Sequence, residues 1–300
     1  MSNDMKKLLF LSTVMLMLLS CGVASNSQQS TTKKQTIRVG TYNLWVTGSG
    51  KGDNLWALRK DRLAQSIADI DFDVFGAQEV DLRHQKELPA LLRKHGAAEY
   101  SWYIFSPYSP DGVGDKAQAI LYKKSRFKLI RSHHFWISET PDTISSGWDE
   151  TKYIRGGCAL ILKDKNTGRK FMFMNSHFPL GKIAKVHAAE IVNAQAQKFN
   201  RDNLPAFFVG DLNTSPKMKG AEIARTYWKD AYLTIPAGNK EGSRGTFNSR
   251  KPDTDMSKAK RIDYIYYRGK MSLLKYCCFN KKYDGFYPSD HCAVYVDAIL

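Results

Sequence analysis

The feature that most constrains this chain is a short apolar run that ends abruptly in polar residues. Residues 205–209 read Pro-Ala-Phe-Phe-Val, which is typical of a strand buried on both faces of an α/β sheet. Asp211 and Asn213 follow directly after Gly210. Residues two apart on an extended chain leave it on the same side. Both side chains can therefore face one point at the carboxyl end of the strand, where open α/β sheets usually place their chemistry, although a plain turn would also explain them.

The composition suits a large core and an anionic partner. The chain has 300 residues, of which 43% are hydrophobic, enough for one large domain or two small ones. Its formal net charge is +16, from 45 Lys and Arg against 29 Asp and Glu. Such a surplus favours nucleic acid, phosphorylated small molecules or an acidic membrane surface. A basic exported protein kept soluble by charge would show the same surplus, so charge alone selects no function.

Residues 1–20 have the pattern of an export signal. Two lysines precede the apolar run 8–19, which is too short to span a bilayer comfortably but suits a signal-peptide core. The run leads into Leu-Leu-Ser-Cys-Gly, which is typical of a bacterial lipobox with Cys21 as the lipid-bearing N-terminus; cleavage nearby would leave that cysteine incidental. The Ser-, Gln- and Thr-rich residues 21–36 predict a flexible tether. We expect an exported lipoprotein of the cell envelope, held to the membrane through this lipid only, with its folded domain at 37–300.

Hydrophobic periodicity predicts mixed strands and helices over the folded part. Strands are expected at 37–42, 74–78, 100–105, 117–122, 128–137, 158–163, 171–177, 205–209, 261–267, 273–279 and 293–300, and helices at 54–70, 82–95 and 184–199. Several adjacent strands have no helix between them, which argues against a doubly wound parallel sheet. We expect an α/β fold of two mixed or antiparallel sheets packed together, with helices outside.

Several of these strands are flanked by polar residues of one chemical kind. They are Asn43, Glu79, Asp211, Asn213, Asp263, Asp290 and His291. Asn, Asp and Glu offer hard oxygen ligands, and sparse carboxylates with water suit Mg²⁺ or Mn²⁺, which polarise a phosphoryl oxygen. Histidine adds a donor for a phosphate oxygen or a proton shuttle. Each residue alone has an ordinary structural role as a turn former, a helix charge or a strand-edge partner, but their joint occurrence indicates a metal-dependent site.

At these residues the sequence resembles the metal-dependent endonuclease/exonuclease/phosphatase superfamily, which includes DNase I-like nucleases, abasic-site endonucleases, neutral sphingomyelinases and inositol polyphosphate phosphatases. The resemblance covers about residues 37–300 and rests on motifs that occur in the family's order. They are Thr41-Tyr42-Asn43-Leu44, Gln78-Glu79, Asn175-Ser176-His177-Phe178, Gly210-Asp211-Leu212-Asn213, Arg261-Ile262-Asp263-Tyr264-Ile265 and Pro288-Ser289-Asp290-His291. The resemblance implies a DNase I-like fold, a four-layer α/β sandwich, in agreement with the periodicity.

The resemblance also implies the ligands of the metal and of the attacking water. Glu79 would be the principal metal ligand, with Asn43 and Asp290 at or near the metal. Asp211 and Asn213 would hold and activate the water. Displacement in line at phosphorus needs such a fixed water, together with a cation on the developing charge.

Two histidines complete the implied machinery. His177 and His291 would bind the phosphoryl oxygens, and Asp263 would poise one of them. A carboxylate beside an imidazole fixes its tautomer and favours its protonated form. The sequence leaves open which histidine Asp263 contacts.

Three further residues are candidate substrate contacts. The segment 134–141, with Trp148 and Arg155 beyond it, is similar to bacterial secreted members whose substrates are generally not established. Arg155 could contact a phosphate, or it could pack with Trp148 within their own loop. Lys116 stands where that subgroup usually has a Glu that partners a catalytic histidine. It could contact an anionic part of the substrate or simply point to solvent.

The sequence therefore predicts a divalent-metal-dependent phosphoester hydrolase, most of all a phosphodiesterase or nuclease. A hydrolase of phospholipid headgroups or of sugar or inositol phosphates is the alternative on the same fold. A non-catalytic binding protein is a third alternative, and the intact set of metal and water residues argues against it. We expect Mg²⁺ or Mn²⁺ as cofactor, a nucleic acid, phospholipid headgroup or sugar phosphate as substrate, and a monomer.

Overall fold

The apolar run at 205–209 lies in strand β8 (Ala206–Asp211), in the interior of a six-stranded sheet of this computed structural model. β8 pairs in parallel with β7 (Lys170–His177) and in antiparallel with β11 (Asp263–Arg268). Every residue of β8 is buried. Helices cover one face of this sheet and the second sheet covers the other, which explains why the strand is apolar on both faces.

The described chain comprises residues 35–109, 116–150 and 152–300. Its part from Ile37 to Leu300 forms one compact unit. The predicted signal peptide at 1–20, Cys21 and the predicted tether up to residue 34 lie outside the described residues. Within the described part, no helix is long and apolar enough to cross a bilayer.

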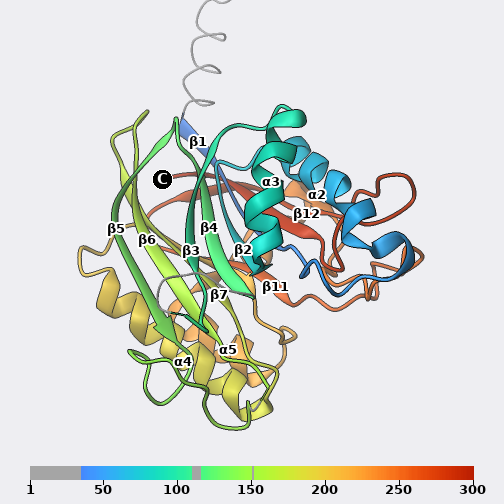
Figure 1. Ribbon diagram of the computed structural model, residues 1–300. Coiled ribbons are helices and arrows are strands. Elements are labelled where there is room, and N and C mark those ends of the chain that lie inside the picture. The colour runs from blue at the N-terminus through green and yellow to red at the C-terminus, as the bar shows by residue number, and fades with distance from the viewer. Residues whose placement is uncertain (1–34, 110–115, 151) are drawn as a thin grey trace, which may run out of the picture. The chain divides into compact units, whose positions relative to one another are not determined.

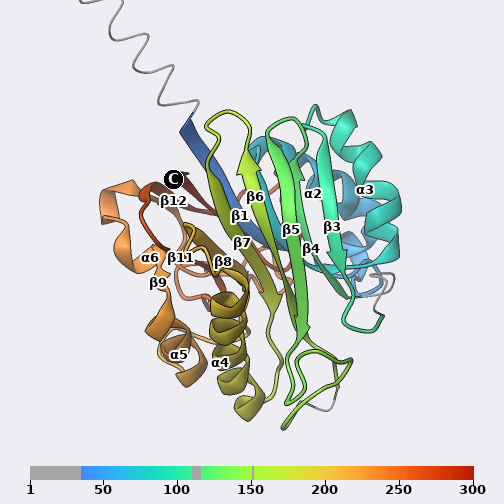
Figure 2. The same ribbon diagram turned by 90° about the vertical axis from the view of Figure 1, so that its left-hand side faces the viewer.

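Two sheets of mixed strand direction form the centre of this unit (Figures 1 and 2). The six-stranded sheet has the order β5-β6-β7-β8-β11-β9, with β5 at Phe127–Trp136, β6 at Gly156–Asp164 and β9 at Lys229–Asp230. The seven-stranded sheet has the order β10-β12-β13-β1-β2-β4-β3, with β1 at Thr36–Asn43, β2 at Val74–Val80, β3 at Tyr100–Phe105, β4 at Ala117–Lys123, β10 at Lys240–Gly242, β12 at Ser272–Phe279 and β13 at Ala293–Ile299. β1 and β2 are parallel, whereas β4 pairs in antiparallel with both β2 and β3.

Helices form the two outer layers. Helices α2 (Trp56–Ile70) and α3 (Leu82–Lys94) cover the seven-stranded sheet, and α4 (Lys182–Phe199) and α5 (Lys219–Tyr227) cover the other (Figures 1 and 2). The shorter α6 (Ala231–Thr234) and the 3₁₀ turns η1 (Gly52–Asn54) and η2 (Ala237–Asn239) lie in connections. The predicted four-layer α/β sandwich is thereby confirmed.

Strand alternation divides the core among the layers. Phe207 of β8 belongs to the apolar cluster between the two sheets, together with Val39 of β1. Its neighbour Phe208 belongs to the cluster beneath α4 and α5, together with Val192. Successive residues of a strand point to opposite faces, so one buried strand contributes to two cores.

The structure contains elements that the periodicity did not predict, namely α5, the short α6 and the short strands β9 and β10. Residues 219–227 form α5, where no helix was predicted. In α2, Leu58 is 54% exposed, whereas Arg59 is fully buried. The inward stripe of α2 includes Trp56, Arg59 and Leu63, so a charged side chain takes an inward position that helical periodicity reserves for apolar residues.

Candidate active site

The predicted site residues meet where the strands of both sheets end. Asn43 is the last residue of β1, and His177 and Asp211 are the last residues of β7 and β8. The register places His177 opposite Asp211, and Asp211 opposite Asp263, the first residue of β11. His291 lies two residues before β13. β7 and β8 end at the edge of the sheet where the antiparallel β11 begins. Residues far apart in sequence therefore become direct neighbours at this edge.

Asp211 is the centre of this group. Its Oδ2 accepts hydrogen bonds from Nδ2 of Asn43 at 3.1 Å and from Nε2 of His177 at 3.3 Å, and it lies 3.7 Å from Nε2 of His291. Its Oδ1 accepts from the backbone N–H of Asn213 at 2.9 Å. Burial opposes ionisation of Asp211, but the positive charge of His291 and the hydrogen bonds from His177 and the Asn213 N–H outweigh it and hold the pKa of Asp211 well below its usual range. Asp211 is therefore a carboxylate, able to orient a water or accept its proton.

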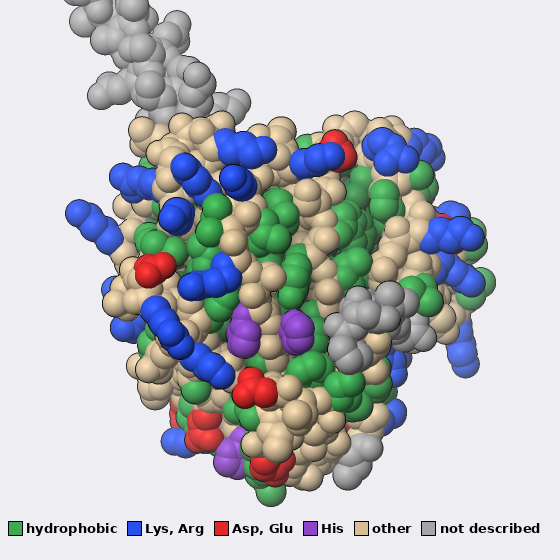
Figure 3. All heavy atoms as spheres, turned by 60° about the vertical axis from the view of Figure 1, so that its left-hand side comes forward, with side chains coloured by type: hydrophobic (Ala, Val, Ile, Leu, Met, Phe, Trp, Pro, Cys, Tyr) green, Lys and Arg blue, Asp and Glu red, His purple; other side chains and the backbone are tan. Residues whose placement is uncertain are grey.

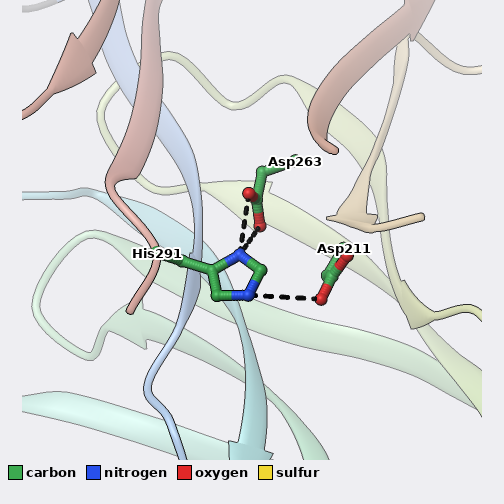
Figure 4. A group of neighbouring side chains, drawn as sticks. All are labelled: Asp211, Asp263 and His291. Carbon is green, nitrogen blue, oxygen red and sulfur yellow. Dashed lines mark hydrogen bonds and ion pairs between the residues drawn. The ribbon is translucent and has the colours of Figure 1, made fainter. Parts of the chain in front are cut away.

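Asp263 contacts His291 (Figure 4). Nδ1 of His291 lies 2.9 Å and 3.1 Å from the two oxygens of Asp263, and the hydroxyl of Thr246 donates to Oδ2 of Asp263 at 2.6 Å. Burial alone would lower the pKa of His291, but the carboxylates of Asp263 and Asp211 raise it well above its ordinary value. Burial raises the pKa of Asp263 to about 6, but the pKa of His291 is raised further. The proton of the pair therefore lies on Nδ1 of His291, and Asp263 is the anion.

His177 has a different partner, and its tautomer follows from it. Nη1 of Arg155 lies 3.0 Å from Nδ1 of His177. Arginine can only donate, so Nδ1 is an acceptor and Nε2 carries the proton that points to Asp211. Burial and the charge of Arg155 both lower the pKa of His177. The two histidines beside Asp211 are thus unlike, with His177 neutral and His291 cationic.

Glu79 and Asp290 add two more carboxylates. Glu79 lies near the end of β2 at φ +57°, where its Oε2 accepts from the backbone N–H of Val46 at 3.1 Å. Burial opposes its ionisation, but the hydrogen bond from the Val46 N–H and the positive charges of His291 and Arg155 lower the pKa of Glu79. For Asp290 burial raises the pKa, and the negative charge of Glu79 adds to the effect. Asp290 is buried and Glu79 is partly buried, and two carboxylates that repel each other favour a cation between them.

These donors fit a hard divalent cation. The predicted metal ligands are the amide of Asn43 and the carboxylates of Glu79 and Asp290, all oxygen donors of the kind that Mg²⁺ and Mn²⁺ bind. One polar atom each of Asp211, Asp263 and His291 lies within 4.8 Å of the others (Figure 4). The two carboxylates offer further oxygen ligands, whereas the cationic His291 has no free lone pair. The hydrogen bond from Asn43 to Asp211 joins the two groups.

Asn213 reaches the site by a different route from the one predicted. Strand alternation predicted that it would project beside Asp211, but β8 ends at Asp211 and Asn213 has φ +47°. Its Nδ2 donates to the carbonyl of Phe178 at 3.1 Å. The turn, and not strand alternation, keeps Asn213 next to Asp211.

Two of the three predicted substrate contacts share one aromatic ring. Nζ of Lys116 lies 4.2 Å from the ring centroid of Tyr153, and Cζ of Arg155 lies 4.7 Å from it. Lys152 approaches the same ring at 5.1 Å. Because Arg155 also contacts His177, this group of Lys116, Lys152, Tyr153 and Arg155, the cation group, borders the catalytic residues.

Trp148, the third predicted contact, lies apart from the cation group. Its ring stacks on His187 of α4 with centroids 4.4 Å apart. In the part of the chain that the structure describes, no ring contact or hydrogen bond joins Trp148 to Asp211, His177 or His291. Its binding role therefore stays a prediction.

Arg59 supports the site and was not among the predicted residues. Its guanidinium donates to the carbonyls of Leu44 at 2.9 Å and of Val46 at 3.1 Å, and also to that of Trp45. Burial lowers its pKa to about 10. These bonds fix the loop that follows Asn43. The same loop contains Val46, whose backbone N–H donates to Glu79. The sequence feature that could have identified Arg59 is its position on the apolar stripe of α2, where a charged residue is unusual.

Thr246 and Tyr153 were not predicted as site residues either. Thr246 orients Asp263, and Tyr153 assembles the cation group. Thr246 acts on a residue 17 positions away, although the segment Gly245-Thr246-Phe247 is similar to the family's substrate-side loop. Tyr153 brings its near neighbours Lys152 and Arg155 together with the distant Lys116.

A carboxylate flanked by two unlike histidines, with further buried carboxylates around it, defines the site of a hydrolytic enzyme. The chain belongs to the Endonuclease/Exonuclease/phosphatase family, whose sequence profile matches residues 40–291, and it is thus a phosphoric ester hydrolase.

Known structures and a relative agree with this assignment. A mannosyl-6-phosphatase of Bacteroides thetaiotaomicron VPI-5482 is 28% identical and superposes with a TM-score of 0.79 over 88% of this chain and 100% of its own. A family protein of Bacteroides vulgatus is 27% identical with a TM-score of 0.79 over 88% and 99%. An uncharacterized protein of Acanthamoeba polyphaga mimivirus is 22% identical over 251 residues, 80% of this chain and 91% of that protein.

Proposed function

We propose that this protein is a divalent-metal-dependent hydrolase of phosphate monoesters, with sugar phosphates as its substrate class. The observation that carries the proposal is the cation group of Lys116, Lys152, Tyr153 and Arg155 beside Asp211 and His177. A phosphate monoester carries close to two negative charges at neutral pH, and a guanidinium binds such a group through paired, charge-assisted hydrogen bonds. The 28% identity to a mannosyl-6-phosphatase supports a sugar as the esterified group.

The residues divide the chemistry between them. Asn43, Glu79 and Asp290 would hold Mg²⁺ or Mn²⁺, which supplies positive charge for the phosphoryl oxygens when bound. Asp211 takes a proton from the attacking water, and Asn213 lies beside it. The cationic His291 donates to a phosphoryl oxygen through Nε2, because its Nδ1 is held by Asp263. Donors placed where charge develops stabilise the transition state.

Arg155 is the strongest candidate for the substrate's phosphate. Its side chain is buried, and among the described residues only His177 hydrogen-bonds to its guanidinium. Arginine has five N–H donors, so most of them are left for another acceptor. A phosphate oxygen at Arg155 would lie next to the water-binding carboxylate.

A phosphodiester, which the sequence analysis favoured, matches this charge less well. A diester carries one negative charge per phosphate, so a single diester group would leave part of the cation group unmatched. A nucleic acid would have to supply a second phosphate at Lys116 and Lys152.

A substrate panel tests the proposal. Mannose 6-phosphate, p-nitrophenyl phosphate, bis-p-nitrophenyl phosphate, plasmid DNA and sphingomyelin are each assayed with Mg²⁺ or Mn²⁺ and again with EDTA. We expect EDTA-sensitive phosphate release that is fastest from the sugar monoester. Faster cleavage of the diester or of DNA would assign the enzyme to phosphodiesterases. Activity that survives EDTA would show that the reaction does not require a divalent metal.

We also propose that the chain is exported and carries a lipid on Cys21. The lipobox-like residues and the polar segment after them support this. Metabolic labelling with an alkyne fatty acid should mark the wild-type chain and leave the Cys21→Ser variant unlabelled. Equal labelling of both would refute the assignment.

A further inference from the structure

Three lysines stand side by side across three neighbouring strands. Lys128 of β5 lies directly opposite Lys163 of β6, and Lys163 lies opposite Lys170 of β7. We call these residues the lysine row. All three side chains are exposed, and none forms an ion pair with any residue in the ranges that the structure describes. Like charges directly opposite each other destabilise a sheet, so the row opposes stability and calls for another explanation.

Further cations surround the lysine row. Arg169 and Lys270 lie in the turns before β7 and before β12. Together with Lys170 they line a hollow of about 450 Å³, whose other walls include Met271 and Ile299. Figure 3 shows Lys and Arg side chains gathered over the upper part of one face, with apolar side chains exposed between them. The surface is therefore basic and partly apolar.

An exposed apolar residue adjoins the row on β5, which is an edge strand of its sheet. Ile130 is 45% exposed and is the extra residue of the bulge between Leu129 and Arg131. Leu129 lies opposite Leu162 and points to the other face of the sheet, so it does not belong to the surface of the row. The phosphates of a nucleic acid would match the cations only. An anionic bilayer matches both, because cations attract its headgroups while apolar side chains enter the interface.

The lysine row lies at the end of the sandwich where β1 begins. The carboxylate of Asp73 accepts from the backbone N–H of Arg38 in β1 at 2.8 Å and from Arg126 at 2.9 Å. Arg126 also contacts Asp164, which follows Lys163 in β6, at 3.1 Å. These bonds connect the start of β1 with the end of β6. The chain between the predicted lipid on Cys21 and β1 would span at most about 50 Å when extended.

The active site lies at the opposite end. β7 runs from Lys170 in the row to His177 in the site, and at about 3.3 Å per residue this separates them by about 23 Å. A protein that rests on the lysine row therefore presents its active site away from the surface beneath it.

We propose that the lysine row, with Ile130 and the nearby cations, is a docking surface for an anionic phospholipid bilayer. It acts alongside the lipid on Cys21 and orients the domain so that the active site faces solution. This surface is separate from the hydrolytic site, so either assignment can fail without the other.

Vesicle co-sedimentation tests the proposal. Because the part from Ile37 to Leu300 is one compact unit with its own core, a chain that starts at Gly22 is used, without signal peptide or Cys21. Vesicles are made of phosphatidylcholine alone, or of phosphatidylcholine and phosphatidylglycerol in equal parts. We expect binding to the anionic vesicles only, and at least about a tenfold loss in the triple variant Lys128→Gln, Lys163→Gln, Lys170→Gln.

A matched variant and two further readouts sharpen the test. The control changes Lys86, Lys219 and Lys258, three exposed lysines on other elements, to Gln, so the net charge falls equally. It should bind as the wild type does. Hydrolysis of p-nitrophenyl phosphate should be unchanged in both variants, and the row variant should melt at a higher temperature because repulsion between its strands is removed.

Three results would overturn the proposal. The wild type could fail to bind anionic vesicles, or the row and control variants could bind them equally. Alternatively, the wild type could bind duplex DNA but no vesicles and lose that binding in the row variant, which would assign the surface to nucleic acid.

Discussion

Gln78 of one sheet and Asn175 of the other are joined by a hydrogen bond of 2.7 Å across the interior of the sandwich. The Nδ2 of Asn175 also donates to the carbonyls of Ala77 and Ala119, each at 2.9 Å. Both amides are fully buried, and each stands one or two residues before a site residue, Glu79 or His177. This polar link therefore sets how the strand ends of the two sheets meet.

Replacing Asn175 by Ala should lower the free energy of unfolding by about 3 kcal/mol, because buried polar partners across the sandwich lose a hydrogen bond without access to water. Urea denaturation followed by circular dichroism measures it. The control Asn239→Ala removes one exposed hydrogen bond, to the carbonyl of Leu274, and should cost less than about 1 kcal/mol. Equal losses of unfolding free energy in the two variants would mean that the buried hydrogen bonds of Asn175 stabilise the protein no more than one exposed hydrogen bond does.

Glu79→Gln should weaken Mn²⁺ binding by more than about tenfold and lower activity with it, because the substitution keeps the shape but removes a charged oxygen ligand. Calorimetric titration of both proteins with Mn²⁺ measures the affinity. Glu87→Gln is the control, since Glu87 pairs with Lys60 on the helical layer. Unchanged affinity in the Glu79 variant would remove this residue from the metal site.

His291→Ala should reduce kcat by roughly 10²–10⁴-fold, because a charged donor to the phosphoryl group is lost. Steady-state kinetics on the preferred substrate of the panel measure the change. The control is His187→Ala, which removes a histidine ring of α4 that stacks on Trp148. This variant should keep kcat near the wild-type value. A wild-type kcat in the His291 variant would leave this residue with a structural role only.

Asp263→Asn should move the alkaline limb of the pH–rate profile to lower pH. The carboxylate of Asp263 raises the pKa of His291 against the effect of burial, and activity needs the protonated ring. Activity therefore falls as pH rises through this pKa, and loss of the carboxylate lowers it. The profile of kcat against pH is the measurement, and an unmoved limb would exclude this pair from catalysis.

Lys116→Glu should raise KM for a substrate with several negative charges much more than for a small monoanionic diester, because a cation of the group around Tyr153 becomes an anion. Mannose 6-phosphate and bis-p-nitrophenyl phosphate provide the two cases. Lys124→Glu, at a lysine exposed beyond β4, is the control. An equal effect on KM for both substrates would exclude Lys116 from recognition of the substrate's charge.

The sequence by itself determined the elements and the chemical kind of the site. The apolar run before Asp211 specified a buried strand with polar residues at its end. Hydrophobic pattern and strand-ending residues such as Gly210 are local properties, so they can be recognised in the sequence. The same holds for Asn43 and Glu79, which follow their strands directly, and most strand bounds lie within two residues of those predicted. Their oxygen donors indicated a divalent metal before any contact was known.

Only the tertiary structure decided which of these residues act on one another. Asn43 and Asp211 are 168 positions apart, yet one donates to the other. His291 received Asp263 as its partner, and His177 received Arg155. Strand order and register create these pairs, and both depend on how two whole sheets pack, so no window of sequence contains them. The lysine row arises in the same way, since three lysines become neighbours only when three strands align.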